Sequence, residues 1–223
     1  MKITALQPMK AHSERMPNKN IKNFCGRPLY HAVLSSLFKS KYIDKVIINT
    51  DSDIIKEDAI KNFERVVIID RPGELQGDFV SMNDIIAYDL SKIDSEHFLQ
   101  THSTNPLLRT ETIDFAIETY FKNLNEFDSL FSVTRLQTRL YWKDSSPINH
   151  NPIELLRTQD LSPVYEENSN FYIFSKKSFT NAAGSRIGRR PKMFEIGKLE
   201  AIDIDEPEDW EIAEILYMRR VIK

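Results

Sequence analysis

The sequence predicts an α/β protein built on one doubly wound, mostly parallel β-sheet. Two observations lead to this fold class. Short apolar runs alternate with stretches of helical periodicity, and polar segments rich in cations or carboxylates directly follow several of these runs. With 223 residues, of which 41% are hydrophobic and 28% charged, the chain is long enough for a single globular domain over residues 1–223 with a buried core.

Buried strands are expected at short apolar runs. Five lie in the first part of the chain, at Ile3–Leu6, Val46–Ile48, Val66–Ile69, Phe98–Gln100 and Leu130–Val133. Two more are expected later, a return to the sheet at Phe171–Phe174 and a last buried strand at Ala201–Ile204. Runs of this length are typical of strands that are covered on both faces of a sheet.

Helices are expected between these strands. One can start at Pro28, and further helices are expected at Ser52–Phe63, Ser81–Leu90 and Thr110–Leu124, each of which opens with a capping residue. Asp205 can cap a C-terminal helix, with Ile212, Ile215, Leu216 and Met218 facing inward. The alternation of strand and helix implies right-handed crossovers, with helices on both faces of the sheet.

The regular alternation stops after about residue 134. Residues 135–168 are rich in polar side chains, contain Pro147, Pro152 and Pro163, and lack a long helical stripe. We interpret this segment as an excursion of loops and short strands that serves as a lid or a dimerisation arm.

Composition excludes several classes of partner. The net charge is −3, so the chain lacks the basic excess that would indicate binding to nucleic acid or to an anionic membrane. No run approaches the roughly 18 apolar residues of a membrane helix, and the N-terminal residues are too polar for a signal peptide. The single cysteine, Cys25, cannot form an internal disulfide and is expected to be a packed residue. We therefore expect a soluble, cytoplasmic protein.

Glycine is scarce in this chain. There are six glycines, and none lies in the first 25 residues, which excludes a Walker loop or a G-x-G-x-x-G turn after the first strand. If the protein binds phosphates, its side chains must supply more of the contacts.

The loop after the first strand, residues 10–22, carries four cations against one acid. In an open α/β sheet, ligands bind beyond the carboxyl ends of the strands. Cations at this place could neutralise a triphosphate and a departing pyrophosphate. The alternative is a solvated surface loop.

Two carboxylates, Asp203 and Asp205, stand two residues apart at the end of the last expected strand. Alternation along a strand puts them on the same side, where they could hold Mg²⁺ against phosphate oxygens. The alternative is that Asp205 only caps the following helix and Asp203 lies on the surface.

Two further polar segments follow expected strands. In residues 70–78, Arg71 could bind a base or a phosphate, although the Pro-Gly pair beside it also suits an ordinary turn. In residues 98–106, Gln100, His102 and Ser103 could bind a polyhydroxylated ligand, although capping of the next helix would use the same residue types.

Taken in order, these segments resemble the acylneuraminate (CMP-sialic acid) cytidylyltransferase family over nearly the whole chain. Residues 9–20 and 48–51 are similar to the family patterns A-R-x-x-S-K-x-x-P-x-K-N and V-S-T-D. Further similar segments are Arg71–Leu75 with Asp78, Leu99–Gln100 with Pro106, Glu167–Asn168 before Phe171–Ile173, and Ile202–Asp205, which matches I-D-I-D. The resemblance implies a fold like that of the nucleotide-diphospho-sugar transferases and a homodimer formed through residues 135–168.

The resemblance also implies a reaction, in which the anomeric hydroxyl of an acidic keto-sugar of the nonulosonic type attacks the α-phosphorus of CTP and releases pyrophosphate. The roles it implies are Lys10, Lys19 and Asp205 in catalysis, Lys10, Ser13, Arg15, Lys19, Asn20 and Arg71 in nucleotide binding, Gln100, Ser103 and Asn168 in sugar binding, and Asp203 and Asp205 as ligands of Mg²⁺.

The chain departs from the family pattern at several positions. Lys10 replaces an arginine, Ala11 and His12 replace a pair that is often Gly-Gly, Glu14 replaces a lysine, and Glu166 stands where many members have an arginine. These departures leave open a nucleotidyltransferase of the same fold with another acceptor or nucleotide, and a relative that binds nucleotide or sugar without catalysis.

Overall fold

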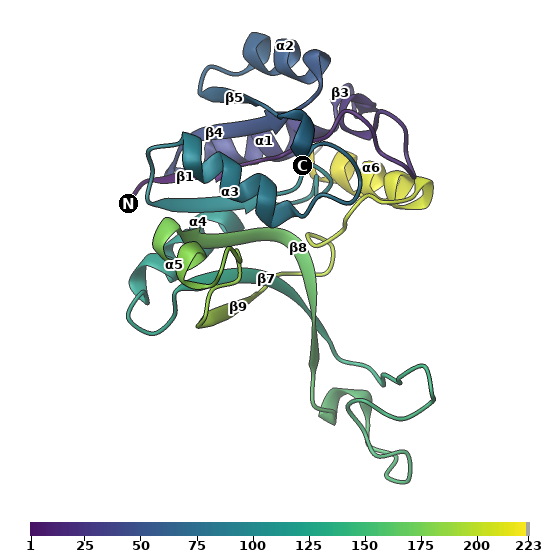
Figure 1. Ribbon diagram of the computed structural model, residues 1–223. Coiled ribbons are helices and arrows are strands. Elements are labelled where there is room, and N and C mark those ends of the chain that lie inside the picture. The colour runs from purple at the N-terminus through teal and green to yellow at the C-terminus, as the bar shows by residue number, and fades with distance from the viewer. Residues whose placement is uncertain (222–223) are drawn as a thin grey trace.

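The computed structural model of the protein describes residues 1–221 and is organised around one seven-stranded sheet (Figure 1). The strand order is β5-β4-β1-β6-β8-β7-β9. The strands are β1 (Ile3–Leu6), β4 (Ile43–Thr50), β5 (Val66–Asp70), β6 (His97–Thr101), β7 (Ser129–Leu136), β8 (Val164–Ser175) and β9 (Pro191–Glu195). A separate two-stranded hairpin joins β2 (Asn23–Phe24) to β3 (Arg27–Pro28).

The prediction of a mostly parallel sheet is confirmed. Strands β5, β4, β1 and β6 pair in parallel, as do β7 and β9. Strand β8 runs antiparallel to both of its neighbours, β6 and β7, and so joins the two parallel parts. The six other expected apolar runs lie within β1, β4, β5, β6, β7 and β8.

The expected last strand at Ala201–Ile204 is wrong, because this segment contains no strand. A turn at Gly197–Ala201 precedes it, and the N–H of Ile204 donates to the carbonyl of Thr104 in the loop after β6. The edge position beside β7 is taken by β9, which sequence reasoning missed. The two carboxylates of this region therefore stand on an extended connection between β9 and the last helix.

Helices cover both faces of the sheet, as predicted. On one face α1 (Tyr30–Lys39), α2 (Asp53–Asn62) and α4 (Thr110–Lys122) share the largest apolar cluster with the sheet. On the other face α3 (Met82–Lys92) and α5 (Lys176–Asn181) pack against a second cluster. Ser52 and Ser81 cap α2 and α3 through their hydroxyl oxygens, as their positions in the sequence predict. Among residues 1–221, none of the helices has both the length and the apolar character needed to cross a membrane.

The C-terminal helix α6 (Pro207–Val221) turns a different face inward from the one expected. Trp210 and Ala213 are buried, together with Phe24 of the hairpin, whereas Ile212, Ile215 and Met218 are about half exposed. The carboxylate of Asp209 accepts hydrogen bonds from the N–H groups of residues 205 and 206. This contact fixes the start of the helix and leaves the Asp205 side chain available for other partners.

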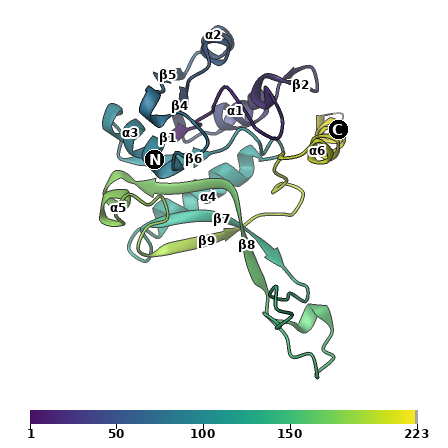
Figure 2. The ribbon, with the colours of Figure 1, turned by 45° about the vertical axis from the view of Figure 1, so that its right-hand side comes forward.

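Residues 137–163 project from the body as an arm between the long strands β7 and β8 (Figures 1 and 2). The arm contains one short 3₁₀ helix, Thr158–Asp160, and no long helix, as its composition predicts. Where the arm leaves the body, the pairing of β7 with β8 shifts register, so that extra residues of β8 bulge out opposite Ser132. Ser169 in this bulge has a left-handed backbone, with φ of 55°. Bulges of this kind re-aim the side chains of a strand.

Candidate functional site

Two cavities adjoin each other at one end of the sheet. The first, which we call the loop cavity, has a volume of about 360 Å³ and lies beyond the carboxyl ends of β1, β5 and β6. Its lining includes Lys10, Ser13, Arg15, Lys19, Asn20, Arg71, Asp78, His102, Ser103 and Asp205. All six residues predicted to bind the nucleotide therefore line one cavity, five of them from the first loop and Arg71 from the loop after β5.

The second cavity, which we call the arm cavity, has a volume of about 480 Å³ and lies at the base of the arm. Its lining includes Thr134, Glu166, Glu167, Asn168, Ser169, Lys198, Asp203 and Asp205. Asp205 lines both cavities, so the two cavities meet at this carboxylate.

The cations of the loop cavity are held by carboxylates. Lys10 Nζ lies 2.5 Å from Asp78 Oδ1, and Arg15 Nη2 lies 2.8 Å from Asp205 Oδ1. Lys19 is buried, and its Nζ donates to the carbonyl of Ile204 at 2.6 Å and to Asp205 Oδ1 at 3.3 Å. Lys19 thus joins the first loop to the connection that carries the carboxylate pair.

Polar side chains hold the first loop in place. Asn20 donates through Nδ2 to the carbonyl of Lys10 at 3.1 Å and accepts from the Ser103 hydroxyl at 2.6 Å. The N–H of Ala11 donates to Asp51 Oδ1 at 2.7 Å. The first loop lacks glycine, and the amide of Ala11 in this loop is already used in a hydrogen bond to a carboxylate of the same chain. Ser103, for which sugar binding was predicted, lies on the loop-cavity side.

Arg71 is buried at the back of the loop cavity and is anchored by protein acceptors. Its Nε donates to Asn49 Oδ1 at 2.8 Å, and its Nη2 donates to the carbonyls of Met9 and Asn49. Asn49 in turn donates through Nδ2 to Asp89 Oδ1 at 2.6 Å. Burial lowers the pKa of Arg71 and raises the pKa of Asp89 to about 7. Sequence reasoning gave no role to Asn49, although it stands in the segment similar to V-S-T-D, and missed Asp89, because a polar residue in a helix carries no motif.

The Asp203–Asp205 pair combines two different electrostatic environments. Burial raises the pKa of Asp203, with the Asp205 carboxylate acting in the same direction. Burial also acts to raise the pKa of Asp205, but the hydrogen bond from Arg15 and the charge of Lys19 outweigh it and hold that pKa below its usual value. Asp203 Oδ1 is buried without a hydrogen-bond partner among the described residues. An orphaned carboxylate oxygen of this kind fits a bound cation.

No group of three or more His, Cys, Asp or Glu side chains within residues 1–221 is arranged to hold a metal alone. A pair of carboxylates suits Mg²⁺ better than a structural metal, because Mg²⁺ commonly takes one or two carboxylates and completes its shell with water and substrate phosphates. The donor set of Asp203 and Asp205 therefore fits that ion.

The two other residues for which sugar binding was predicted are placed differently. Asn168 lines the arm cavity, but its Nδ2 donates to Thr134 Oγ1 at 2.9 Å and its Oδ1 accepts from the N–H of Asn170, so the amide also braces the bulge of β8. Gln100 is fully buried beneath the two cavities rather than in the lining found for either. Its Oε1 accepts from Arg186 Nη1 at 2.6 Å.

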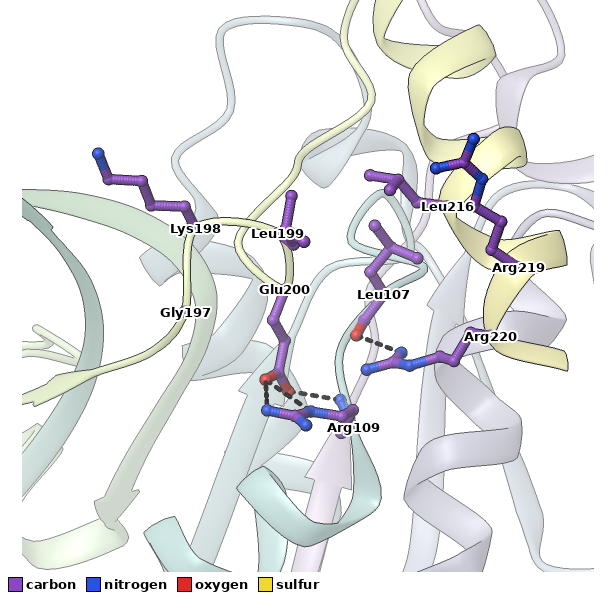
Figure 3. A pocket seen from close by; sticks show the side chains of 9 residues that line it. All are labelled: Leu107, Arg109, Gly197, Lys198, Leu199, Glu200, Leu216, Arg219 and Arg220. Carbon is purple, nitrogen blue, oxygen red and sulfur yellow. Dashed lines mark hydrogen bonds and ion pairs between the residues drawn. The ribbon is translucent and has the colours of Figure 1, made fainter. Parts of the chain in front are cut away.

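A further cavity, of about 750 Å³, is lined by none of the site residues predicted from the sequence (Figure 3). Glu200 on its wall is buried and accepts from the N–H of Arg109 at 2.7 Å and from Arg109 Nε at 3.0 Å. This pair ties the turn before Asp203 to the start of α4. Figure 3 shows Lys198, on the same turn, directed away from Leu107 and Leu216. Sequence reasoning missed Lys198 and Glu200, because nothing distinguishes them from surface charges.

Comparison with known proteins identifies relatives that match nearly the whole chain. A pseudaminic acid cytidylyltransferase of Campylobacter jejuni is 25% identical over 97% of this chain and 97% of its own length. A CMP-N,N'-diacetyllegionaminic acid synthase of Legionella pneumophila is 26% identical over 97% of this chain and 96% of its own. The solved structure of a CMP:2-keto-3-deoxy-manno-octonic acid synthetase complexed with CTP shares the fold, with a TM-score of 0.72 and 15% identity over 99% of this chain and all of that one.

A family model described as cytidylyltransferase matches residues 4–221, which is nearly the whole chain. The predicted family and fold class are thus confirmed together. The chain belongs to the cytidylyltransferase family, and it is a nucleotidyltransferase by that membership.

Proposed function

We propose that this protein transfers CMP from CTP to the anomeric hydroxyl of an acidic sugar of the nonulosonic type and releases pyrophosphate. The observation that carries this proposal is the meeting of two unlike cavities at Asp205, one rich in cations and one bordered by the arm. The relatives named for pseudaminic and legionaminic acid support a nonulosonic acceptor.

The loop cavity would hold CTP. Lys10, Arg15 and Lys19 are paired with carboxylates, and we propose that the triphosphate takes the place of those carboxylates as their partner. Charge on the leaving pyrophosphate grows during transfer, so cations fixed beside it stabilise the transition state more than the ground state. Ser13 and Asn20 would add hydrogen bonds, and Arg71 would support the loop near the cytidine.

Asp203 and Asp205 would hold Mg²⁺, which fits the unpartnered Oδ1 of Asp203. A bound Mg²⁺ neutralises phosphate charge and favours deprotonation of the attacking hydroxyl. The two carboxylates fix where that charge is placed, because Lys19 also donates to the carbonyl of Ile204 at 2.6 Å and so anchors the connection that carries them after its ion pair with Asp205 is released. With both carboxylates at the junction of the cavities, donor and acceptor would meet at the same point.

The arm cavity would hold the acceptor sugar. It is bordered by four carboxylates, two of which form the proposed metal pair, and Lys198 is its only lysine or arginine among the residues found to line it. A sugar acid needs a cation to offset its carboxylate, so we propose that Lys198 pairs with that group. Thr134, Asn168 and Ser169 supply hydroxyl and amide groups for the sugar hydroxyls.

We further propose that two copies of the chain associate through the arm. Within the described arm, Ile153 is 93% and Leu155 90% exposed, and Trp142 is 63% exposed. Exposed apolar side chains gathered on one projecting element indicate a covered surface. Sedimentation analysis tests this proposal, because Ile153→Asp with Leu155→Asp should convert a dimer into a monomer, and a wild-type monomer would contradict it.

The transfer proposal is tested by pyrophosphate release. The protein is incubated with Mg²⁺, each of CTP, UTP, GTP and ATP, and a panel containing pseudaminic, legionaminic and N-acetylneuraminic acids and simpler 2-keto sugar acids. Release is expected only with CTP and at least one nonulosonic acid. Release with another nucleotide, or only with an acceptor outside the nonulosonic class, would favour another nucleotidyltransferase of the same fold.

A further inference from the structure

A line of polar side chains runs beneath the floor of the two cavities, with Arg186 at its centre. Arg186 lies in the loop between α5 and β9. Its Nη1 donates to Gln100 Oε1 at 2.6 Å, and its guanidinium lies 3.7 Å from the ring centroid of Tyr172. Gln100 on β6 and Tyr172 on β8 are direct cross-strand neighbours, so the guanidinium of Arg186 contacts both members of one cross-strand pair.

The line ends at one cavity on each side. On the loop-cavity side, Gln100 Nε2 lies 3.3 Å from His102 Nε2, and His102 lines that cavity. On the arm-cavity side, the Tyr172 hydroxyl donates to the Glu167 carboxylate and lies 3.1 Å from Ser169 Oγ. Glu167 and Ser169 both line the arm cavity.

The two ends depend on Arg186 to different degrees. Gln100 has a second anchor, because its Nε2 also donates to the carbonyl of Thr101 at 3.0 Å. Glu167 accepts from the Tyr172 hydroxyl and interacts with the nearby positive charge of Arg186. Gln100 and Tyr172 are fully buried and Arg186 is partly buried beside them, and a guanidinium in such surroundings interacts more strongly with neighbouring charges because the local dielectric is low. Loss of Arg186 should therefore disturb the arm cavity more than the loop cavity.

We propose that Arg186 is a positioning residue for the acceptor: it holds Tyr172, and through it Glu167, in the wall of the arm cavity and supplies a partly buried positive charge under a site bordered by carboxylates. Without that charge, an acidic sugar meets a more negative cavity and a less ordered wall. This inference rests on the proposed function and adds a residue that touches neither substrate.

The test compares Arg186→Met and Arg186→Lys with Arg189→Met, an exposed arginine three positions along the same loop, which serves as the matched control. With the best acceptor of the panel, Arg186→Met should raise the acceptor KM about tenfold while the CTP KM changes by less than about twofold. Arg186→Lys keeps the charge and should recover most of the loss. Arg189→Met should match the wild type.

Folding of each variant is checked by the rise in Tm that CTP produces. If Arg186→Met gives no such rise, Tyr172→Phe carries the test, because it keeps the ring under the guanidinium and removes only the hydroxyl, with its contacts to Glu167 and Ser169. Its acceptor KM should rise about threefold or more, with the CTP KM unchanged. An unchanged acceptor KM, or equal changes for both substrates, overturns the inference. A wild-type protein that transfers to no acidic sugar overturns the proposed function, and the inference falls with it.

Discussion

The buried carboxyl group of Asp89 should make the stability of this protein depend on pH in a way that one substitution removes. Asp89 is 1% exposed on α3, and Asn49 Nδ2 donates to its Oδ1, while its Oδ2 has no partner among the described residues. Burial raises its pKa from 3.8 to about 7, against the opposing effects of the Asn49 bond and the Arg71 charge. The folded state therefore keeps this proton over a pH range in which the unfolded state has lost it.

The sign and size of the effect follow from linkage. Because the pKa of an acid is higher in the folded state, the free energy of unfolding falls as pH rises from the unfolded pKa towards the folded pKa, and then levels off. A shift of about three pKa units corresponds to about 4 kcal/mol in total. Between about pH 5 and about pH 8, Asp89 should thus lower stability by roughly 2 to 3 kcal/mol.

Urea unfolding of wild type and Asp89→Asn at a series of pH values measures this effect. The amide keeps an acceptor for Asn49 and cannot ionise, so the stability of the variant relative to the wild type should rise by roughly 2 to 3 kcal/mol between about pH 5 and about pH 8. The other titrating groups contribute equally to the stability of both proteins, so their contributions cancel in the difference between the two. Asp84→Asn, at an exposed carboxylate of the same helix, is the control. If the difference in unfolding free energy between Asp89→Asn and the wild type stays constant within about 0.5 kcal/mol over this pH range, the reasoning is refuted.

Three further substitutions test the site. Asp205→Asn should reduce pyrophosphate release on the order of 100-fold, because the side chain at the junction of the cavities loses its charge. The rise in Tm that CTP produces should persist in this variant. Undiminished release would show that Asp205 takes no part in the mechanism. Lys198→Ala should raise the acceptor KM about tenfold with the CTP KM unchanged, and a rise in the CTP KM alone would assign Lys198 to the nucleotide. Glu200→Gln should lower the free energy of unfolding by about 1 to 3 kcal/mol, because the buried carboxylate of Glu200 holds Arg109; a loss no larger than that of Glu195→Gln, at an exposed glutamate, would show that the pair is not stabilising.

Much of the fold follows from local patterns in the sequence. The apolar runs mark β1, β4 and β6 because strands buried on both faces need continuous apolar side chains. The edge strand β5 carries an apolar run of the same kind, although its side chains are only partly buried or exposed. The serine caps mark α2 and α3. Strand β9 escaped prediction because it is a short edge strand with only Phe194 buried, and its neighbours in the sequence are charged.

The inward face of α6 could not be predicted because its partner is a non-local hairpin. Trp210 and Ala213 pack on Phe24, nearly 190 residues away in the sequence, so the helix is oriented by that contact rather than by its own periodicity. The same limit applies at Ala201–Ile204, because Ile204 is buried, and Ile202 partly buried, in the cluster that includes Trp210 and Ala213 of α6 and not in the sheet. Apolar content alone does not distinguish the two kinds of burial.

The candidate site likewise contains some residues that the sequence predicts and others that only the tertiary structure reveals. The residues of the first loop and Arg71 stand in motifs directly after strands, and the carboxyl ends of the parallel strands β1 and β5 bring them together. The aspartate pair is predicted by its own motif, although it stands on a connection and not at the end of a strand. Lys198 and Arg186 reach the site from the turn before Ala201 and the loop before β9, where only the tertiary structure assigns them a neighbour.

The central claim is that CTP in the loop cavity and an acidic sugar in the arm cavity react at the junction marked by Asp205. The most direct measurement is ³¹P NMR of a reaction containing the protein, Mg²⁺, CTP and a nonulosonic acid. The account predicts that a CMP-sugar phosphodiester signal and pyrophosphate appear in equal amounts, and that both are lost with Asp205→Asn. Consumption of CTP to free CMP with no CMP-sugar, or no consumption in a protein that binds both compounds, would contradict it.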